Sequence, residues 1–249
     1  MKALTITIVT VCYNAHENIE KTIKSIVNQT YKHIEYIIID GGSKDGTLDI
    51  IKKYSQHISL CISEPDNGIF DAMNKGLLRA TGDYIIYINA GDFLYKTTTI
   101  EECVKQLTMF PLTDVLYGST LFSSQKKYKL THPKPFFLSR SSLKPMGICH
   151  QSLLVSTTIA KKYMFDLQYA YSADYAMIKN IYSNNGTFLE YKDIISIYDT
   201  NGISSVNTVG RLKDEAKICG IKINSYIYIK TLFILKIKSY IKTFLKLIK

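Results

Sequence analysis

An α/β fold with a mainly parallel central sheet is predicted by two features of the 249-residue sequence. Short runs rich in β-branched and aromatic residues alternate with helical patterns of roughly 10–15 residues in the first part of the chain, which predicts crossover connections and parallel strands. Several of these runs end in Asn, Asp or Gly. Because ligands of open α/β sheets bind beyond the carboxyl ends of the strands, we expect a polar crevice there, suited to a phosphorylated small molecule.

Residues 1–95 are expected to form the first half of one large domain. Ile19, Ile23, Ile26 and Val27 follow the i, i+4, i+7, i+8 spacing of an amphipathic helix. Thr47 is placed to cap a second helix. The predicted strands are 3–11, 34–40, 58–63 and 84–89, and the predicted helices are 19–27, 47–54 and 69–79.

Residues 96–205 are expected to form the second half, where the alternation is less regular. Residues 123–146 are polar and basic and hold three of the five prolines, which predicts an exposed loop. The other elements predicted here are helices 100–109 and 175–182 and strands 115–120, 151–156 and 186–198.

The tail, residues 206–249, carries most of the formal net charge of +10. Eight lysines and no acidic residue lie between Ala216 and Lys249, and the rest of the chain is close to neutral, so the charge does not indicate nucleic-acid binding. The tail is also apolar, and an apolar face beside lysines suits a helix lying on an anionic membrane surface. The alternative is a helix packed on the body or on a second subunit. The lysines are Lys238, Lys242, Lys246 and Lys249, beside Ile237, Ile241, Phe244, Leu245 and Ile248.

The remaining composition favours a cytoplasmic protein. The five cysteines form no C-x-x-C pair and are expected to be reduced. No uncharged apolar run approaches the ~18 residues needed to span a bilayer. The apolar start of the chain is broken by threonines and has no small-residue cleavage site, so we interpret it as a strand rather than a signal peptide.

Polar motifs follow the predicted strands in a characteristic order. Their combination resembles family 2 glycosyltransferases, which are inverting enzymes with the GT-A fold, over residues 4–205. The downstream motifs resemble a subgroup found in capsule, exopolysaccharide and O-antigen synthesis. The motifs are residues 10–14 (TVCYN), 29–31 (QTY), 40–47 (DGGSKDGT), 63–68 (SEPDNG), 71–76 (DAMNKG), 80–83 (ATGD), Asp92, 150–152 (HQS), Asp174 and 202–204 (GIS).

The resemblance implies a nucleotide-diphosphate sugar donor, expected to be a UDP-sugar. Asp40 would contact the base, although an Asp there also commonly caps a turn. The family's arginine before the asparagine at position 74 is replaced by Met73. Lys75, or an arginine elsewhere, would supply the missing charge. The residues expected to bind the donor are Thr10, Tyr13, Asn14, Asp40, Asp66, Asp71, Asn74, Lys75, Asn89, His150 and Gln151. Three of these residues have structural alternatives to donor binding. Tyr13 could pack in the core, Asp66 could form a turn, and His150 could have a purely structural role.

A divalent cation, Mn²⁺ or Mg²⁺, is also implied, because hard oxygen ligands hold such a cation against a diphosphate leaving group. The family's D-x-D element reads Asn89-Ala90-Gly91-Asp92 here, so Asp92 is the carboxylate left to bind the metal. Asn89 would face the ribose or the metal. The alternative is that Asp92 caps the next segment.

Inverting transfer needs a base that removes the proton of the acceptor hydroxyl. The family places this carboxylate at the start of a helix in the second half, and Asp174 matches that position. The alternative to catalysis is that Asp174 occurs at this position only because the helix dipole favours an acidic residue there.

These features predict an inverting enzyme that transfers sugar to a lipid-linked saccharide at the inner face of the cell membrane, in bacterial surface polysaccharide synthesis. A nucleotidyltransferase would usually have a glycine-rich loop after the first strand, and a dinucleotide oxidoreductase needs G-x-G-x-x-G there; neither is present. A non-catalytic carbohydrate-binding protein would be marked by loss of the acids at 92 and 174, and both are retained.

Overall fold

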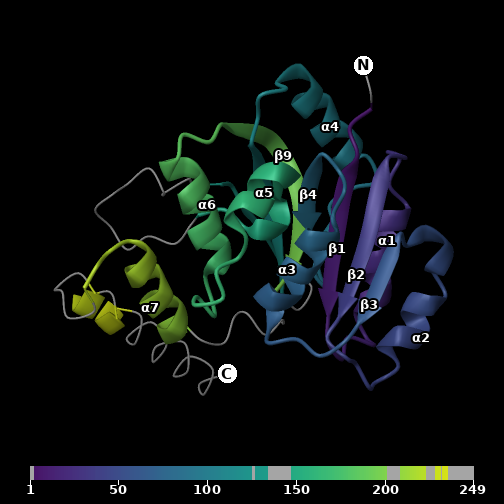
Figure 1. Ribbon diagram of the computed structural model, residues 1–249, viewed down its shortest axis with the longest axis horizontal. Coiled ribbons are helices and arrows are strands. Elements are labelled where there is room, and N and C mark those ends of the chain that lie inside the picture. The colour runs from purple at the N-terminus through teal and green to yellow at the C-terminus, as the bar shows by residue number, and fades with distance from the viewer. Residues whose placement is uncertain are drawn as a thin grey trace.

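A single sheet runs through the molecule in the computed structural model and carries helices on both faces (Figure 1). The structure describes residues 3–124, 127–133, 147–200, 208–222, 228–230 and 232–234. Among them the sheet has nine strands in the order β3-β2-β1-β4-β8-β6-β9-β5, and β7 pairs with β6.

The N-terminal part of the sheet is parallel, as the alternation of strands and helices predicts. The residues of β1 are all buried, and β1 lies between β2 and β4 with Val9 opposite Ile37 and Tyr87. Strand β2 in turn pairs in parallel with β3. These strands are β1 (Ile6–Cys12), β2 (Ile34–Asp40), β3 (Leu60–Ser63) and β4 (Tyr84–Tyr87).

The remaining strands make the sheet mixed, because they add antiparallel pairs to the parallel ones. Strand β8 is antiparallel to both β4 and β6, and β5 is antiparallel to β9, whereas β6 and β9 are parallel with an irregular register. The loop predicted for residues 123–146 is wrong in part, because β7 pairs antiparallel with β6; residues 125–126 and 134–146 lie outside the described residues. The bounds are β5 (Phe93–Leu94), β6 (Val115–Ser124), β7 (Lys127–Thr131), β8 (Leu153–Ser156) and β9 (Phe188–Asp199).

Helices cover the two faces of the sheet in two groups, because alternate strand residues point to opposite sides. Ile6 and Ile8 pack with α1, α2 and α4, whereas Val9 and Val11 pack with α3, α5 and α6. Helix α3 approaches β1 closely: a Cβ atom on Gly76 would lie 2.5 Å from Val9. The helices are α1 (Ile19–Val27), α2 (Thr47–Lys52), α3 (Ile69–Arg79), α4 (Thr99–Met109), α5 (Thr157–Tyr163) and α6 (Ala173–Ser183), with short 3₁₀ turns at Ser55–His57 and His150–Ser152.

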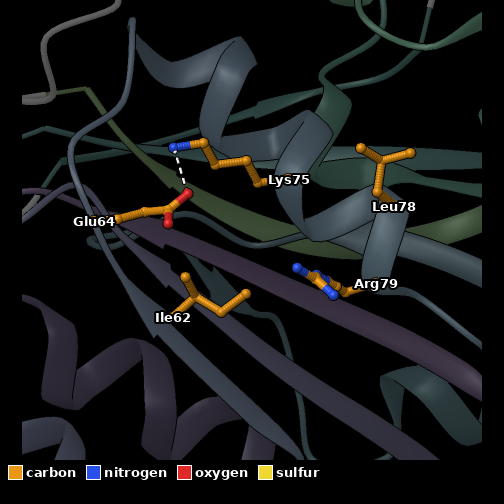
Figure 2. A pocket seen from close by; sticks show the side chains of 5 residues that line it. All are labelled: Ile62, Glu64, Lys75, Leu78 and Arg79. Atoms are coloured by element: carbon orange, nitrogen blue, oxygen red, sulfur yellow. Dashed lines mark ion pairs between the residues drawn. The ribbon is translucent and has the colours of Figure 1, made fainter.

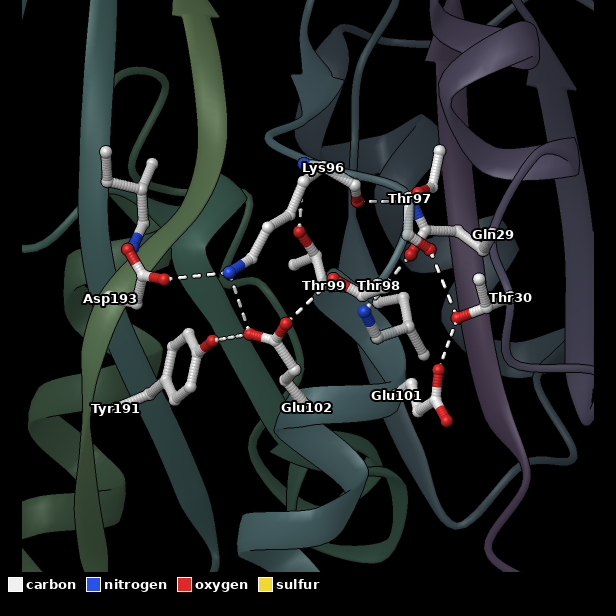
Figure 3. Close-up of polar contacts among 12 residues, drawn as sticks. Gln29, Thr30, Lys96, Thr97, Thr98, Thr99, Glu101, Glu102, Tyr191 and Asp193 are labelled. Carbon is white, nitrogen blue, oxygen red and sulfur yellow. Dashed lines mark hydrogen bonds and ion pairs between the residues drawn. The ribbon is translucent and has the colours of Figure 1, made fainter.

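The QTY motif has a structural role. Gln29 is buried, and its Nε2 donates to the carbonyls of Ser25 and Lys96, both at 2.9 Å. Its Oε1 accepts from the N–H of Ile100 at 3.1 Å. Lys96 also pairs with Asp193 of β9 at 2.9 Å (Figure 3). This network joins the end of α1, the start of α4 and β9.

Part of the tail packs against the body. Helix α7 (Thr208–Ile218) contacts α6, where Lys179 Nζ donates to the carbonyl of Ile218 at 2.6 Å. Tyr228 is buried with Leu212 and Ala216. The lysine-rich face predicted over residues 237–249 lies outside the described residues, so its membrane role remains a prediction. In the part of the chain that is described, no helix has the length and apolar character to cross a membrane.

Candidate functional site

The loops that follow β1 and β2 are hydrogen-bonded to each other. Asn14 has a φ of 45°, its N–H donates to Ser43 Oγ at 2.8 Å, and its Oδ1 accepts from the N–H of Lys44 at 3.0 Å. The N–H of Ala15 donates to Thr47 Oγ1 at 2.8 Å. Asn14 therefore holds the two loops together at the end of the sheet where the donor is expected.

Asp40 forms the turn that follows β2, the alternative considered for it from the sequence. Its carboxylate is fully buried and accepts from the N–H groups of Gly42 and Ser43 at 3.1 and 3.0 Å and from Ser63 Oγ at 2.6 Å. Burial raises the pKa of Asp40, but the hydrogen bonds from Ser43 and Ser63 outweigh it and hold that pKa below its usual value. A contact with the base would require one of these hydrogen bonds to be exchanged.

Gly41, in this turn, lies in close contact with the side chains of Tyr13 and Asp66. A Cβ atom on Gly41 would lie 2.5 Å from Asp66 Oδ2 and 3.2 Å from Tyr13 Cδ2, so only glycine leaves both side chains in place. Tyr13 is 60% exposed, which excludes core packing as its role and leaves its ring free to stack on a planar base. Asp66 Oδ1 accepts from the N–H of Gly68 at 2.8 Å.

The predicted donor-binding residues of α3 are already engaged within the protein. Asn74 exchanges two hydrogen bonds with the backbone of Phe165, at 2.8 and 2.9 Å. Lys75 pairs with Glu64 at 2.9 Å, on the rim of a surface hollow between β3 and α3 (Figure 2). Asp71 accepts from the N–H of Asn67 at 2.9 Å. These contacts fix α3 and its preceding loop, and a ligand would have to exchange them.

Thr10, predicted to bind the donor, lies inside the protein and not at its surface. Its side chain is fully buried, and its hydroxyl donates to the carbonyl of Ile88 at 2.8 Å and contacts Tyr36 Oη at 3.1 Å. The structure therefore places Thr10 in the packing between β1, β2 and β4.

Asp92 is held in a buried position just beyond β4. Its Oδ2 accepts from Gln151 Nε2 at 2.8 Å, and its Oδ1 accepts from the N–H of Asp199 at 3.0 Å. Burial raises the pKa of Asp92 to about 6, because two neutral donors only partly replace the water that a carboxylate loses. Both predicted residues, Asp92 and Gln151, are thus in direct contact.

His150 connects the predicted donor side with the predicted base. Its Nε2 lies 3.1 Å from Asn89 Nδ2, and its Nδ1 lies 3.1 Å from Asp174 Oδ2. Asp174 stands in the first turn of α6, and its Oδ1 accepts from the N–H of Tyr175 at 2.8 Å. Asn89 Oδ1 is buried and has no hydrogen-bond partner among the described residues.

Two contributions to this site were not predicted from the sequence. One is the N–H of Asp199, which reaches Asp92 from the end of β9. The other is the carbonyl and N–H of Phe165, which hold Asn74. Backbone groups leave no side-chain signal, and both lie about a hundred residues from their partners in the sequence, so only the fold reveals them.

Comparison with known proteins identifies the class. The family model described as "Glycosyl transferase family 2" matches residues 7–181, which is more than half of the chain. The chain therefore belongs to glycosyl transferase family 2 and is a glycosyltransferase.

Several proteins are similar to this chain. An uncharacterized glycosyltransferase of Mycobacterium tuberculosis, Rv1514c, is 29% identical over 71% of this chain and 68% of its own length. A PGL/p-HBAD biosynthesis glycosyltransferase of Mycobacterium bovis is 27% identical over 76% of this chain and 72% of its own length. TuaG of Bacillus subtilis, a putative teichuronic acid biosynthesis glycosyltransferase, is 37% identical over 35% and 36%.

Solved structures support the GT-A fold. Staphylococcus aureus TarS 1–349 in complex with UDP-GlcNAc has a TM-score of 0.71 at 16% identity, and the match covers 90% of this chain and 68% of that fragment; in the complex with UDP it covers 61% of the fragment. Glucosyl-3-phosphoglycerate synthase of M. tuberculosis, in complex with Mn²⁺, UDP and phosphoglyceric acid, has a TM-score of 0.62 at 14% identity. The match covers 88% of this chain and 80% of the synthase chain.

Proposed function

We propose that this protein is an inverting glycosyltransferase that moves a sugar from a UDP-sugar to a hydroxyl of a lipid-linked saccharide in bacterial surface polysaccharide synthesis. The single observation that carries the proposal is the chain of contacts from Asn89 through His150 to Asp174. It joins the predicted donor side, at the end of β4, to the predicted base, at the start of α6, in one site.

The base is Asp174. Its carboxylate takes the proton of the acceptor hydroxyl while that oxygen attacks the anomeric carbon from the side opposite the diphosphate. One bond to the anomeric carbon forms as the bond to the leaving diphosphate breaks, so the configuration inverts. Asp174 lies in the first turn of α6, a position that suits an acidic side chain.

The donor-side residues fit a divalent cation, Mn²⁺ or Mg²⁺. The described residues include no cluster of three or more His, Cys, Asp or Glu side chains able to hold one. Magnesium is commonly bound by one or two carboxylates together with substrate phosphates, and Asp92 supplies one carboxylate. The unpartnered buried Asn89 Oδ1 is a further oxygen of the type that such ions bind. When bound, the cation would offset the charge of the leaving diphosphate.

Support for the donor and the pathway comes from similar proteins. TarS was solved with UDP and UDP-GlcNAc, and a mannosyltransferase of Pyrobaculum calidifontis was solved with Mn²⁺. The relatives named for PGL/p-HBAD and teichuronic acid biosynthesis make cell-surface glycans the favoured product. We further propose that the protein is cytoplasmic and that its lysine-rich tail binds the inner membrane surface, where a lipid-linked acceptor would lie.

The test is a donor screen. Purified protein, Mn²⁺ or Mg²⁺ and a lipid-diphosphate saccharide acceptor are incubated with single nucleotide sugars, and the released nucleotide and the glycosylated lipid are both measured. We expect release of UDP that depends on the acceptor and is lost reversibly on chelation. Release of pyrophosphate from nucleotide triphosphate and sugar phosphate would instead indicate a nucleotidyltransferase, and saccharide binding without turnover of any donor would indicate a carbohydrate-binding protein.

A further inference from the structure

The protonation pattern of His150 follows from its two neighbours. Asn89 presents Nδ2 to the ring, and an amide nitrogen can only donate a hydrogen bond. His150 Nε2 must therefore accept, so the proton of the neutral ring is on Nδ1. That N–H then donates to Asp174 Oδ2 at 3.1 Å. Both His150 and Asp174 have side chains that are more than four-fifths buried, which protects these contacts from exchange with water.

The opposite orientation of the amide is unfavourable. It would place Asn89 Oδ1 against Nε2 and require a proton there, which leaves an unprotonated Nδ1 facing the carboxylate of Asp174 unless the ring becomes charged. In the observed orientation Asn89 Oδ1 is buried and lacks a partner among the described residues. A buried acceptor without a partner costs about 1–3 kcal/mol, so either a hydroxyl of the bound donor or the proposed cation would stabilise this orientation by reaching Oδ1.

We propose that His150 is a positioning residue that holds Asp174 through its Nδ1–H and that Asn89 selects this tautomer. Oδ2 of the carboxylate is thereby held by His150 Nδ1–H and Oδ1 by the N–H of Tyr175, so that the remaining lone pairs are left for the acceptor hydroxyl. Donor bound at Asn89 favours the amide orientation that keeps His150 in this state. This effect of donor binding on the base rests on the proposed function, whereas the assignment of the His150 tautomer does not.

Two isosteric substitutions separate the two contacts of the ring. His150→Asn places an amide where Nδ1 was and retains a donor for Asp174, whereas His150→Gln places an amide where Nε2 was and retains a partner for Asn89. We expect His150→Gln to lower kcat by roughly 10–100-fold, the scale for losing an orienting partner of a reactive group, with little change in UDP affinity. His150→Asn should retain kcat within about tenfold. Equal losses in both variants, at unchanged melting temperatures, would overturn the proposal.

A double-mutant cycle with Asp174→Asn tests whether His150 acts through the base. In that background His150→Gln should cost less than about threefold in residual kcat, because the group that it positions is already lost. The same loss in both backgrounds would show that the histidine acts elsewhere.

The tautomer is measured without any activity, by ¹⁵N NMR of histidine-labelled protein at neutral pH. We expect the His150 proton on Nδ1 in the wild type, and protons on both ring nitrogens in Asn89→Asp, where each nitrogen faces a carboxylate that accepts. A wild-type ring protonated only on Nε2 would refute the proposal. The NMR measurement tests the tautomer even if the protein turns over no donor. Absence of turnover would count against the proposed function and not against the tautomer.

Discussion

Replacing Asp92 by asparagine is expected to stabilise the metal-free protein at neutral pH while abolishing sugar transfer. Burial raises the pKa of Asp92 from 3.8 to about 6. A raised carboxyl pKa means that the folded state binds the proton more tightly than the unfolded state, so stability is lost as the pH rises through 6. The shift of roughly two units corresponds to about 3 kcal/mol at pH 7.5, at 1.36 kcal/mol per unit.

Asparagine removes that cost and keeps the packing, because Gln151 can turn its amide to present Oε1 to the new Nδ2. Thermal unfolding in a chelating buffer should show a gain of roughly 6–12 °C for Asp92→Asn at pH 7.5, from 2–4 °C per kcal/mol for a chain of this size. The gain should fall to roughly half near pH 5 and disappear below pH 3.8, where Asp92 is protonated in the unfolded chain as well as in the folded one. Asp49→Asn, at an exposed site, is the control and should shift stability by less than about 0.5 kcal/mol. Destabilisation by Asp92→Asn at pH 7.5, or a gain that does not depend on pH, would refute the reasoning.

Four further outcomes are expected. Asp174→Asn should lower kcat on the order of 10²–10⁴-fold with UDP affinity retained by calorimetry, and lost affinity with normal saturated turnover would show a binding role instead. Tyr13→Ala should weaken UDP binding by about 1–3 kcal/mol through lost stacking, whereas the exposed Tyr128→Ala should not; equal affinities would exclude stacking. Asn74→Ala should cost roughly 2–4 kcal/mol in denaturant unfolding, because two buried backbone groups lose their partner, and a loss under 1 kcal/mol would contradict this. Deleting residues 235–249 should abolish co-sedimentation with anionic vesicles and leave the melting temperature unchanged, whereas a packed tail predicts lower stability and no vesicle binding by the intact chain.

The arrangement of the N-terminal half was predictable because its signals are local. A buried strand, a helix with apolar residues every three or four positions and a polar strand end are each visible within about ten residues. The parallel direction of β1, β2 and β4 follows from crossovers of this kind. For the same reason Asp92 at the end of a strand and Asp174 at the start of a helix could be chosen as reactive candidates before their surroundings were known.

What the sequence by itself determined is therefore the class of fold, the parallel half of the sheet and the candidate acids. Tertiary structure alone decided the antiparallel insertion of β8 between β4 and β6, and the contact of His150 with both Asn89 and Asp174. It also decided that Asp92 is buried deeply enough to raise its pKa to about 6. These properties depend on groups that are distant in the sequence, and desolvation and hydrogen bonding act over a few ångströms of space whatever the separation along the chain.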